Sequence, residues 1–297
     1  MCPLPCRNFR VPSVSIAIVS MFVIAICAGL IGSASVAQTR KQTAIFAISS
    51  EGVDGSMDAL AVVEEKRLRS PYTDKQPDRE TFANAYFKKT NTYRLIFGGG
   101  DAGTATVTKW SEGCNNIHAQ VNLSTSARLG GKVMALATNS ETLGKRSISR
   151  RPPTDAERSA TLTLMKSIYQ QNRTPASLMN SIKVTNLTAT DLNGDGKYEM
   201  IGSFMLTGKN KFERDLFLIA TPQGASMRAE FVKFQAYQPP PEGFLSSIDF
   251  VDQLDIDGDG VGEVFATQGG FDGYQYLVFK KINGRWRKIF DMIGDAC

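Results

Sequence analysis

The sequence predicts a mainly β protein with a short helical insert near residues 154–182. Short runs rich in β-branched and aromatic residues, bounded by Gly, Asn or Ser, recur along the chain. Two long stretches near the C-terminus repeat one order of apolar run, acidic turn and strand. Helical spacing of apolar residues is clearest only in the insert. The chain has 297 residues, of which 42% are hydrophobic, enough for one large core or two small ones.

Residues 1–37 have the features of a targeting segment. Two arginines precede a long uncharged apolar run, and Ser35 and Ala37 fit the small-residue positions of a signal-peptidase site. An apolar run of about 20 residues is also long enough to span a bilayer. The segment is therefore either a cleaved signal peptide or an N-terminal anchor formed by residues 13–32. Both alternatives predict a secreted, periplasmic or extracellular protein.

The net charge bears on the class of partner, and the cysteine content bears on disulfide formation. The net charge is +5, and loss of the leader lowers it to +3 because the leader holds two arginines and no acid. So small an excess does not indicate a nucleic-acid partner, and a membrane role is expected only if the leader stays uncleaved. Three of the five cysteines lie in the leader. Cys114 and Cys297 either form a disulfide in an oxidising compartment or stay unpaired.

Residues 38–143 form a β-rich N-terminal region. We expect strands within 43–49, 92–99, 104–110, 119–123 and 132–138. The glycine run at 97–104 predicts a hairpin turn between two of them. Residues 58–69 fit either a short helix or a strand.

Residues 144–182 are predicted to be a basic, proline-containing connector followed by a helical segment. The run 144–153 is basic and ends in two prolines, which favours a solvated connector. Thr154 and Glu157 fit a capping box that opens a helix ending near Asn172. Its apolar stripe consists of Ala160, Leu164, Met165, Ile168 and Tyr169. A second short helix is expected within 175–182.

Two acidic, glycine-rich nonapeptides lie 64 residues apart in the region 183–297. They are "DLNGDGKYE" at 191–199 and "DIDGDGVGE" at 255–263. Oxygen-bearing side chains occupy positions one, three, five and nine, and glycines occupy positions four and six. Ca²⁺ takes six to eight oxygen ligands in a compact, flexible cage, and the glycines permit the tight turns that such a cage needs.

The pattern therefore predicts two calcium sites. Magnesium is less suited, since it prefers rigid octahedral sites and keeps its waters. At position seven, Lys197 and Val261 would contribute backbone carbonyls. The predicted ligands are Asp191, Asn193, Asp195, Lys197 and Glu199 in the first loop, and Asp255, Asp257, Asp259, Val261 and Glu263 in the second.

An EF-hand is excluded, because position twelve is Gly202 or Ala266 instead of glutamate and a strand pattern follows. The stretches "TDLNGDGKYEMI" and "LDIDGDGVGEVF" resemble the core motif of FG-GAP/VCBS-type repeats. The resemblance covers about 183–297. It implies FG-GAP-like β repeats in a partial or small β-propeller, with calcium stabilising each repeat. The N-terminal strands would then be degenerate blades or a separate β domain.

The sequence favours a binding protein over an enzyme. His118 is the only histidine, so no histidine-based triad or metal site is expected, and no common catalytic motif occurs. The acids Glu51, Asp54 and Asp58 fit either an acidic site or a solvated turn. Three stretches are weak candidates for binding: the proline-rich 234–244, the aromatic 269–276, and the basic hairpin 280–288 carrying Trp286.

The sequence thus predicts an exported calcium-binding β-repeat protein that acts as a binding, adhesion or scaffold module. Its partner would be a protein or polysaccharide at the cell surface, an expectation drawn partly from the repeat family. The alternatives are an exported hydrolase-type enzyme that uses the repeats as a scaffold, and a purely structural protein without a ligand beyond calcium. A pair of carboxylates in a cleft outside the metal loops would favour the hydrolase.

Overall fold

The computed structural model describes residues 42–51, 54–208, 213–237, 247–270 and 273–296. The predicted leader, with its two alternative roles, lies outside the described residues. Within the described ranges, no helix is long and apolar enough to cross a membrane. The described chain is mainly β, as predicted.

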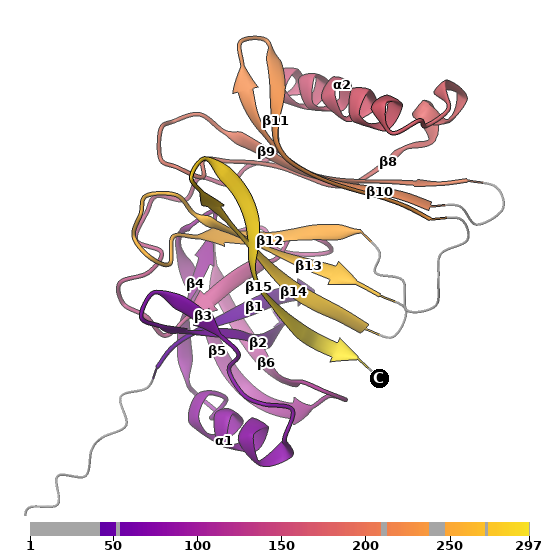
Figure 1. Ribbon diagram of the computed structural model, residues 1–297. Helices are drawn as coiled ribbons and strands as arrows, with labels where there is room; N and C mark the ends of the chain where they lie inside the picture. Colours follow the sequence, from indigo (N-terminus) through magenta and orange to yellow (C-terminus); the bar gives the residue numbers. More distant parts are fainter. Residues whose placement is uncertain (1–41, 52–53, 209–212, 238–246, 271–272, 297) are drawn as a thin grey trace, which may run out of the picture. The chain divides into compact units, whose positions relative to one another are not determined.

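Six strands of the N-terminal region close into an antiparallel barrel (Figure 1). Its strand order is β1, β7, β4, β5, β6, β2, and the pairing of β2 with β1 closes the ring, while β3 extends β2. The strands are β1 (Thr43–Glu51), β2 (Asp54–Glu64), β3 (Arg67–Arg69), β4 (Thr92–Phe97), β5 (Gly100–Glu112), β6 (Ile117–Thr125) and β7 (Ala135–Thr138). The predicted strands are confirmed, and the ambiguous segment 58–69 is a hairpin. In this region the strands form one closed sheet and not the blades of a propeller.

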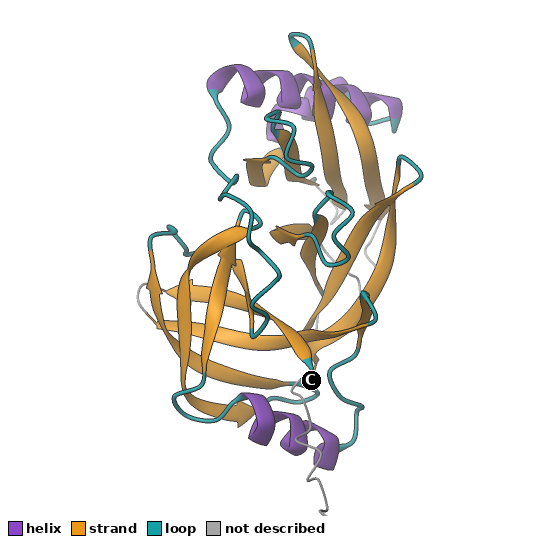
Figure 2. Ribbon diagram, turned by 90° about the vertical axis from the view of Figure 1, so that its left-hand side faces the viewer, coloured by secondary structure: helices purple, strands orange, loops and turns teal. Residues whose placement is uncertain are grey.

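The alternation of side chains along β1 gives the barrel two apolar faces. Phe46 and Ile48 lie in the barrel's own core, whereas Ile45 and Ala47 pack outward against the C-terminal sheet. Helix α1 (Gln76–Tyr86), which the sequence did not predict, adds aromatic side chains to the barrel core, where Phe82 stacks on Tyr86 at 4.4 Å between ring centroids. Figure 2 shows this helix beside the barrel strands.

The connector leads into helix α2 (Asp155–Gln171), whose capping box is confirmed. Thr154 accepts the amide of Glu157, and the Glu157 carboxylate accepts the amide of Thr154. The helix ends at Gln171, with Asn172 as its C-cap, and a 3₁₀ turn, η1 (Ala176–Ser181), follows. The predicted solvated connector is wrong at Arg150, which is only 7% exposed. Its guanidinium donates to main-chain carbonyls and lies near a buried carboxylate, which the basic composition did not reveal.

Each acidic nonapeptide belongs to a four-stranded antiparallel sheet of the same simple order. The first sheet contains β8 (Lys183–Thr190), β9 (Glu199–Thr207), β10 (Glu213–Gln223) and β11 (Ser226–Tyr237). The second contains β12 (Ile248–Leu254), β13 (Glu263–Gly269), β14 (Gly273–Ile282) and β15 (Arg285–Ala296). In both sheets the nonapeptide joins the first strand to the second, so the repeat seen in the sequence is also a repeat of structure.

The second sheet is buried on both faces. Phe265 and Val278 pack against the outer face of the barrel, while Val264 and Phe279 face the first sheet. Helix α2 covers the other face of the first sheet (Figure 1), where Tyr169 is fully buried. The second sheet therefore contacts both the barrel and the first sheet.

Two further predictions concern the C-terminal hairpin and the cysteines. In the stretch 280–288, Trp286 is buried between the sheets and Lys281 pairs with Glu230, while Arg285, Arg287 and Lys288 are exposed. Cys114 is disulfide-bonded. Cys297 lies outside the described residues, so its pairing with Cys114 stays a prediction.

Asp215 on β10 is a buried carboxylate whose oxygens lack hydrogen-bond partners among the described residues. The residue is 3% exposed. Burial, together with the nearby carboxylates of Glu213 and Asp249, raises its pKa to about 7. The folded chain thus keeps a proton that the unfolded chain has already released.

Replacement Asp215→Asn should therefore stabilise the protein selectively at alkaline pH. The contribution of Asp215 to stability is present below its unfolded pKa of 3.8 and is lost as pH rises through about 7. We expect the variant's melting temperature to exceed that of the wild type by ~2–5 °C near pH 8 and to differ little near pH 5. Thermal melts across this range test it, with the exposed Asp155→Asn as control. An equal effect at both pH values would contradict a titrating Asp215.

Candidate metal centre

The two nonapeptides fold into loops with the same hydrogen-bond pattern. The carboxylate at position one accepts the amides at positions four and six. Asp191 accepts Gly194 N at 2.7 Å and Gly196 N at 2.9 Å. In the second loop Asp255 accepts Gly258 N at 2.8 Å and Gly260 N at 3.1 Å. All four glycines have positive φ, between 72° and 91°, which confirms the expected need for glycine.

The glutamate at position nine closes each loop from the strand that follows. Glu199 accepts the amide of Leu192 at 2.9 Å, and Glu263 accepts that of Ile256 at 2.8 Å. Both glutamates are buried, being 6% and 2% exposed. By contrast, Asn193 and Asp195 at positions three and five of the first loop lie in solvent. Each loop thus has one buried and several accessible oxygen donors.

The two loops lie side by side. The amide of Gly262 donates to Leu192 O at 2.7 Å, which joins the second loop directly to the first. Arg146 of the connector donates to the same carbonyl at 3.3 Å and to the Asp255 carboxylate at 3.2 Å. The sequence did not predict this role for Arg146, since nothing local in the basic run distinguishes it from its neighbours.

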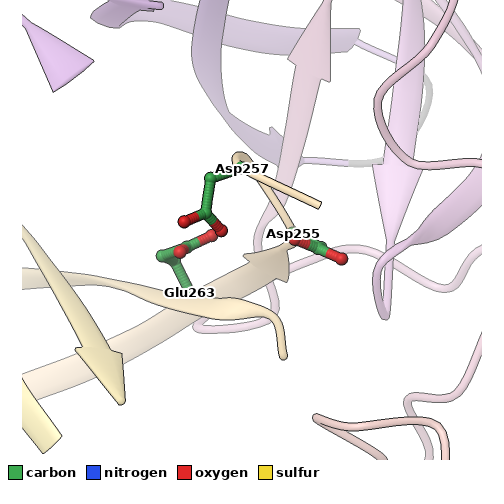
Figure 3. A group of neighbouring side chains, drawn as sticks. All are labelled: Asp255, Asp257 and Glu263. Atoms are coloured by element: carbon green, nitrogen blue, oxygen red, sulfur yellow. The ribbon is translucent and has the colours of Figure 1, made fainter. Parts of the chain in front are cut away.

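A lysine ammonium occupies the point on which the second loop's acids converge. Oxygens of Asp255, Asp257 and Glu263 lie within 4.8 Å of one another (Figure 3). Lys280 Nζ on β14 lies 2.9 Å from Asp257, 2.7 Å from Asp259 and 2.6 Å from Glu263. The loop therefore already holds a cation, supplied by its own sheet. The three carboxylates raise the pKa of Lys280, although burial opposes them.

The first loop differs at the equivalent position. In the antiparallel pair of β13 and β14, Val264 lies opposite Phe279. The next pair of residues along the two strands is therefore Glu263 and Lys280. β9 pairs with β10 so that Met200 faces Ala220, and the same step places the neutral Thr221 opposite Glu199. No ion pair involves the first loop's acids among the described residues.

The missing counter-charge has an electrostatic consequence. Burial, with a smaller contribution from the Asp195 and Asp191 carboxylates, raises the pKa of Glu199 to about 7, although hydrogen bonds from main-chain amides oppose the rise. A cation that enters the first loop would favour the ionised form of Glu199. Lys280 belongs to the basic stretch that the sequence marked, but its place beside Glu263 depends on the pairing of β13 with β14.

The residues present fit a bound calcium ion. Carboxylates and an amide carbonyl are the hard oxygen donors that calcium prefers, and the lysine shows that the second loop can enclose a cation. Gly202 and Ala266 lie within strands β9 and β13, in agreement with the exclusion of an EF-hand. His118 lies on β6 and exchanges a hydrogen bond with Ser111 at 2.9 Å.

Comparisons of the chain with protein-family models, curated proteins and solved structures found no match. The resemblance to FG-GAP/VCBS-type repeats therefore rests on the residues of the two loops.

Replacement Lys280→Thr should make the second loop depend on an added cation. Without metal the variant leaves three carboxylates close together, and we expect a loss of about 1–3 kcal/mol in unfolding free energy. Calcium should restore most of it. Chemical denaturation in EDTA and in calcium measures both effects. The control Lys281→Thr removes the pair with Glu230 and should show no calcium rescue. An equally small calcium effect in both variants would contradict the role of Lys280.

Proposed function

We propose that the protein is an exported, calcium-stabilised β-repeat module that acts by binding a protein or polysaccharide at the cell surface. One observation carries the calcium part of this proposal. Two sequence repeats form loops with matching hydrogen bonds, and one of them encloses a cationic group. Asp191, Asn193, Asp195, Glu199 and the Lys197 carbonyl would hold calcium in the first loop. The corresponding residues, with the Val261 carbonyl, would hold it in the second.

The two loops would bind calcium with different ease. In the first, calcium meets oxygens that have no competing cation among the described residues. In the second, it must displace the Lys280 ammonium from Asp257, Asp259 and Glu263. We therefore assign the stronger site to the first loop and the weaker one to the second.

The position of the loops supports a structural role for the metal. The Leu192 carbonyl of the first loop accepts hydrogen bonds from the second loop and from the connector. An ion bound in the first loop would therefore stiffen the junction between both sheets. Extracellular calcium modules bind at about 10⁻⁴–10⁻³ M. With roughly millimolar calcium and a 10⁻⁴ M site, the gain in stability is ~1.4 kcal/mol. This magnitude suits reinforcement of a scaffold better than a sensitive switch.

We further propose that the two four-stranded sheets are FG-GAP-like units of a partial propeller. Their shared order of strand, calcium loop and strand supports this. The barrel then supplies the surface against which the second unit is buried.

The exported hydrolase is a second candidate, favoured by one observation. It requires paired carboxylates in a cleft outside the metal loops, and Asp58 and Asp295 line one such cavity between the barrel and the second sheet. Release of reducing ends from polysaccharides, lost in both Asp58→Asn and Asp295→Asn, would support catalysis. If no tested polysaccharide releases reducing ends, the result supports a binding protein and not a hydrolase.

Calcium dependence is tested by thermal melts in EDTA, in calcium and in magnesium. We expect a calcium-specific rise of a few degrees that Asp195→Asn reduces. Thr221→Lys should place an ammonium beside Glu199, as Lys280 stands beside Glu263. It should raise stability in EDTA and weaken the calcium response, whereas Thr221→Gln, similar in size but uncharged, should do neither. No calcium-specific shift up to several millimolar would reduce both loops to acidic turns.

A further inference from the structure

A polar cavity of about 520 Å³ lies between the barrel and the second sheet. Asp58 and His118 reach it from the barrel strands β2 and β6, while Tyr274 and Tyr276 reach it from β14 and Asp295 from β15. Two stretches that the sequence marked separately, the acids around Asp58 and the aromatic segment 269–276, thus meet in one place. A cavity of this size suits a small organic ligand.

Two tyrosines hold the Asp58 carboxylate in a fixed position. Its Oδ2 accepts the Tyr274 hydroxyl at 2.5 Å and the Tyr276 hydroxyl at 2.7 Å. The two rings are edge to face, with centroids 5.5 Å apart, and Tyr276 is only 1% exposed. The carboxylate is therefore preorganised, because its tyrosine partners cannot easily reorient.

The other oxygen of Asp58, Oδ1, can accept hydrogen bonds from a ligand. No hydrogen bond to Oδ1 occurs within the described part of the chain, although Asp58 lines the cavity. Burial raises the pKa of this carboxyl, and the Asp295 carboxylate also raises it, while both tyrosine hydroxyls lower it. A donor at Oδ1 would favour the ionised form in the same way.

The charges that line the cavity do not balance. Asp249 is neutralised by Lys132 at 2.7 Å. Neither Asp58 nor Asp295 has an ion-pair partner in the described ranges, and Asp295 accepts only the amide of Asn115 at 3.2 Å. The cavity therefore carries an excess of negative charge that a cationic guest would offset.

We propose that this cavity binds a small organic cation through its primary ammonium group, with Asp58 as the principal acceptor. Three N–H donors of an ammonium suit the free Asp58 oxygen and the neighbouring Asp295 carboxylate. The aromatic wall formed by Tyr274 would add a favourable contact with the cation. An anion would be repelled by both carboxylates. A tightly held metal ion is not indicated, because Asp58 and Asp295 offer fewer oxygen donors than the six to eight that Ca²⁺ takes.

The cavity continues into a second hollow along the barrel, of about 640 Å³, which shares Ser49, Ser56 and His118 with it. The hydroxyl group of Thr108 and the side-chain amides of Gln120 and Asn122 line this extension. A ligand that carries hydroxyls beside its ammonium group would fit both parts. The shared requirement remains the ammonium, and the choice of probes separates a plain amine from an amino sugar.

Saturation-transfer NMR on the full chain tests the proposal with three amines and their neutral counterparts. The pairs are ethanolamine with ethylene glycol, putrescine with 1,4-butanediol, and glucosamine with glucose. We expect saturable binding of at least one amine, a much weaker signal for its counterpart, and a loss of about tenfold or more in affinity in Asp58→Asn. A preference for glucosamine would indicate that the extension is also used.

Two variants guard against misfolding. Glu64→Gln removes an exposed acid from the same strand, outside both hollows, and should leave binding unchanged. Tyr274→Phe removes one of the two tyrosine hydroxyls that donate to Asp58 and should weaken binding less than Asp58→Asn does. Equal binding of amines and neutral compounds, no binding of any amine, or binding unaffected in Asp58→Asn would each overturn the proposal.

This inference is independent of the calcium proposal. The cavity and the loops share no residue, so Asp58→Asn should keep the calcium-dependent rise in melting temperature. If that rise is retained while amine binding is absent, only the cavity proposal fails. If amines bind but calcium has no effect, only the calcium proposal fails.

Discussion

Arg150 and Asp252 form a buried ion pair where the barrel, the connector and the second sheet meet. Their charged atoms lie 3.9 Å apart, and both side chains are almost fully removed from solvent. The guanidinium donates to Val251 O and Met134 O and lies over the rings of Phe97 and Phe250. Both Asp252 oxygens accept the amide of Gly98, at 2.9 Å each. Loss of one partner would leave an uncompensated buried charge, at a cost of about 3–5 kcal/mol.

The same junction positions the acidic loops. Gln253, next to Asp252, donates to Thr190 Oγ1 at 2.7 Å and to Asp191 O at 3.0 Å, at the entrance of the first loop. Two residues later Asp255 opens the second loop. The ends of β8 and β12 are thereby fixed together, which brings two strongly acidic loops side by side. Such a cluster of acids needs cations, and the chain supplies Arg146 and Lys280 to the acids of the second loop only. The asymmetry between the two repeats follows from this placement of charge.

Much of the local structure was predictable from the sequence, but little of its assembly was. The strands, the capping box at Thr154 and the glycines of both loops follow from residue spacing and backbone preference. Closure of the barrel depends on pairing between β1 and β2, and the burial of Arg150 depends on contacts with β12, a hundred residues away. Helix α1 was missed because its polar residues hide a weak apolar stripe. The meeting of Asp58 with Tyr274 likewise joins segments more than 200 residues apart.

We propose that, at moderate calcium concentration, the two repeated loops satisfy their buried acids by different cations, a metal ion in the first and Lys280 in the second, where calcium displaces the lysine only at higher concentration. A crystal structure determined at moderate calcium concentration, with anomalous data that locate calcium, tests this most directly. The account predicts an anomalous peak within the first loop, coordinated by Asp191, Asp195 and Glu199, and a lysine ammonium against Glu263 in the second. A peak in the second loop with none in the first, or no peak in either loop, would contradict it.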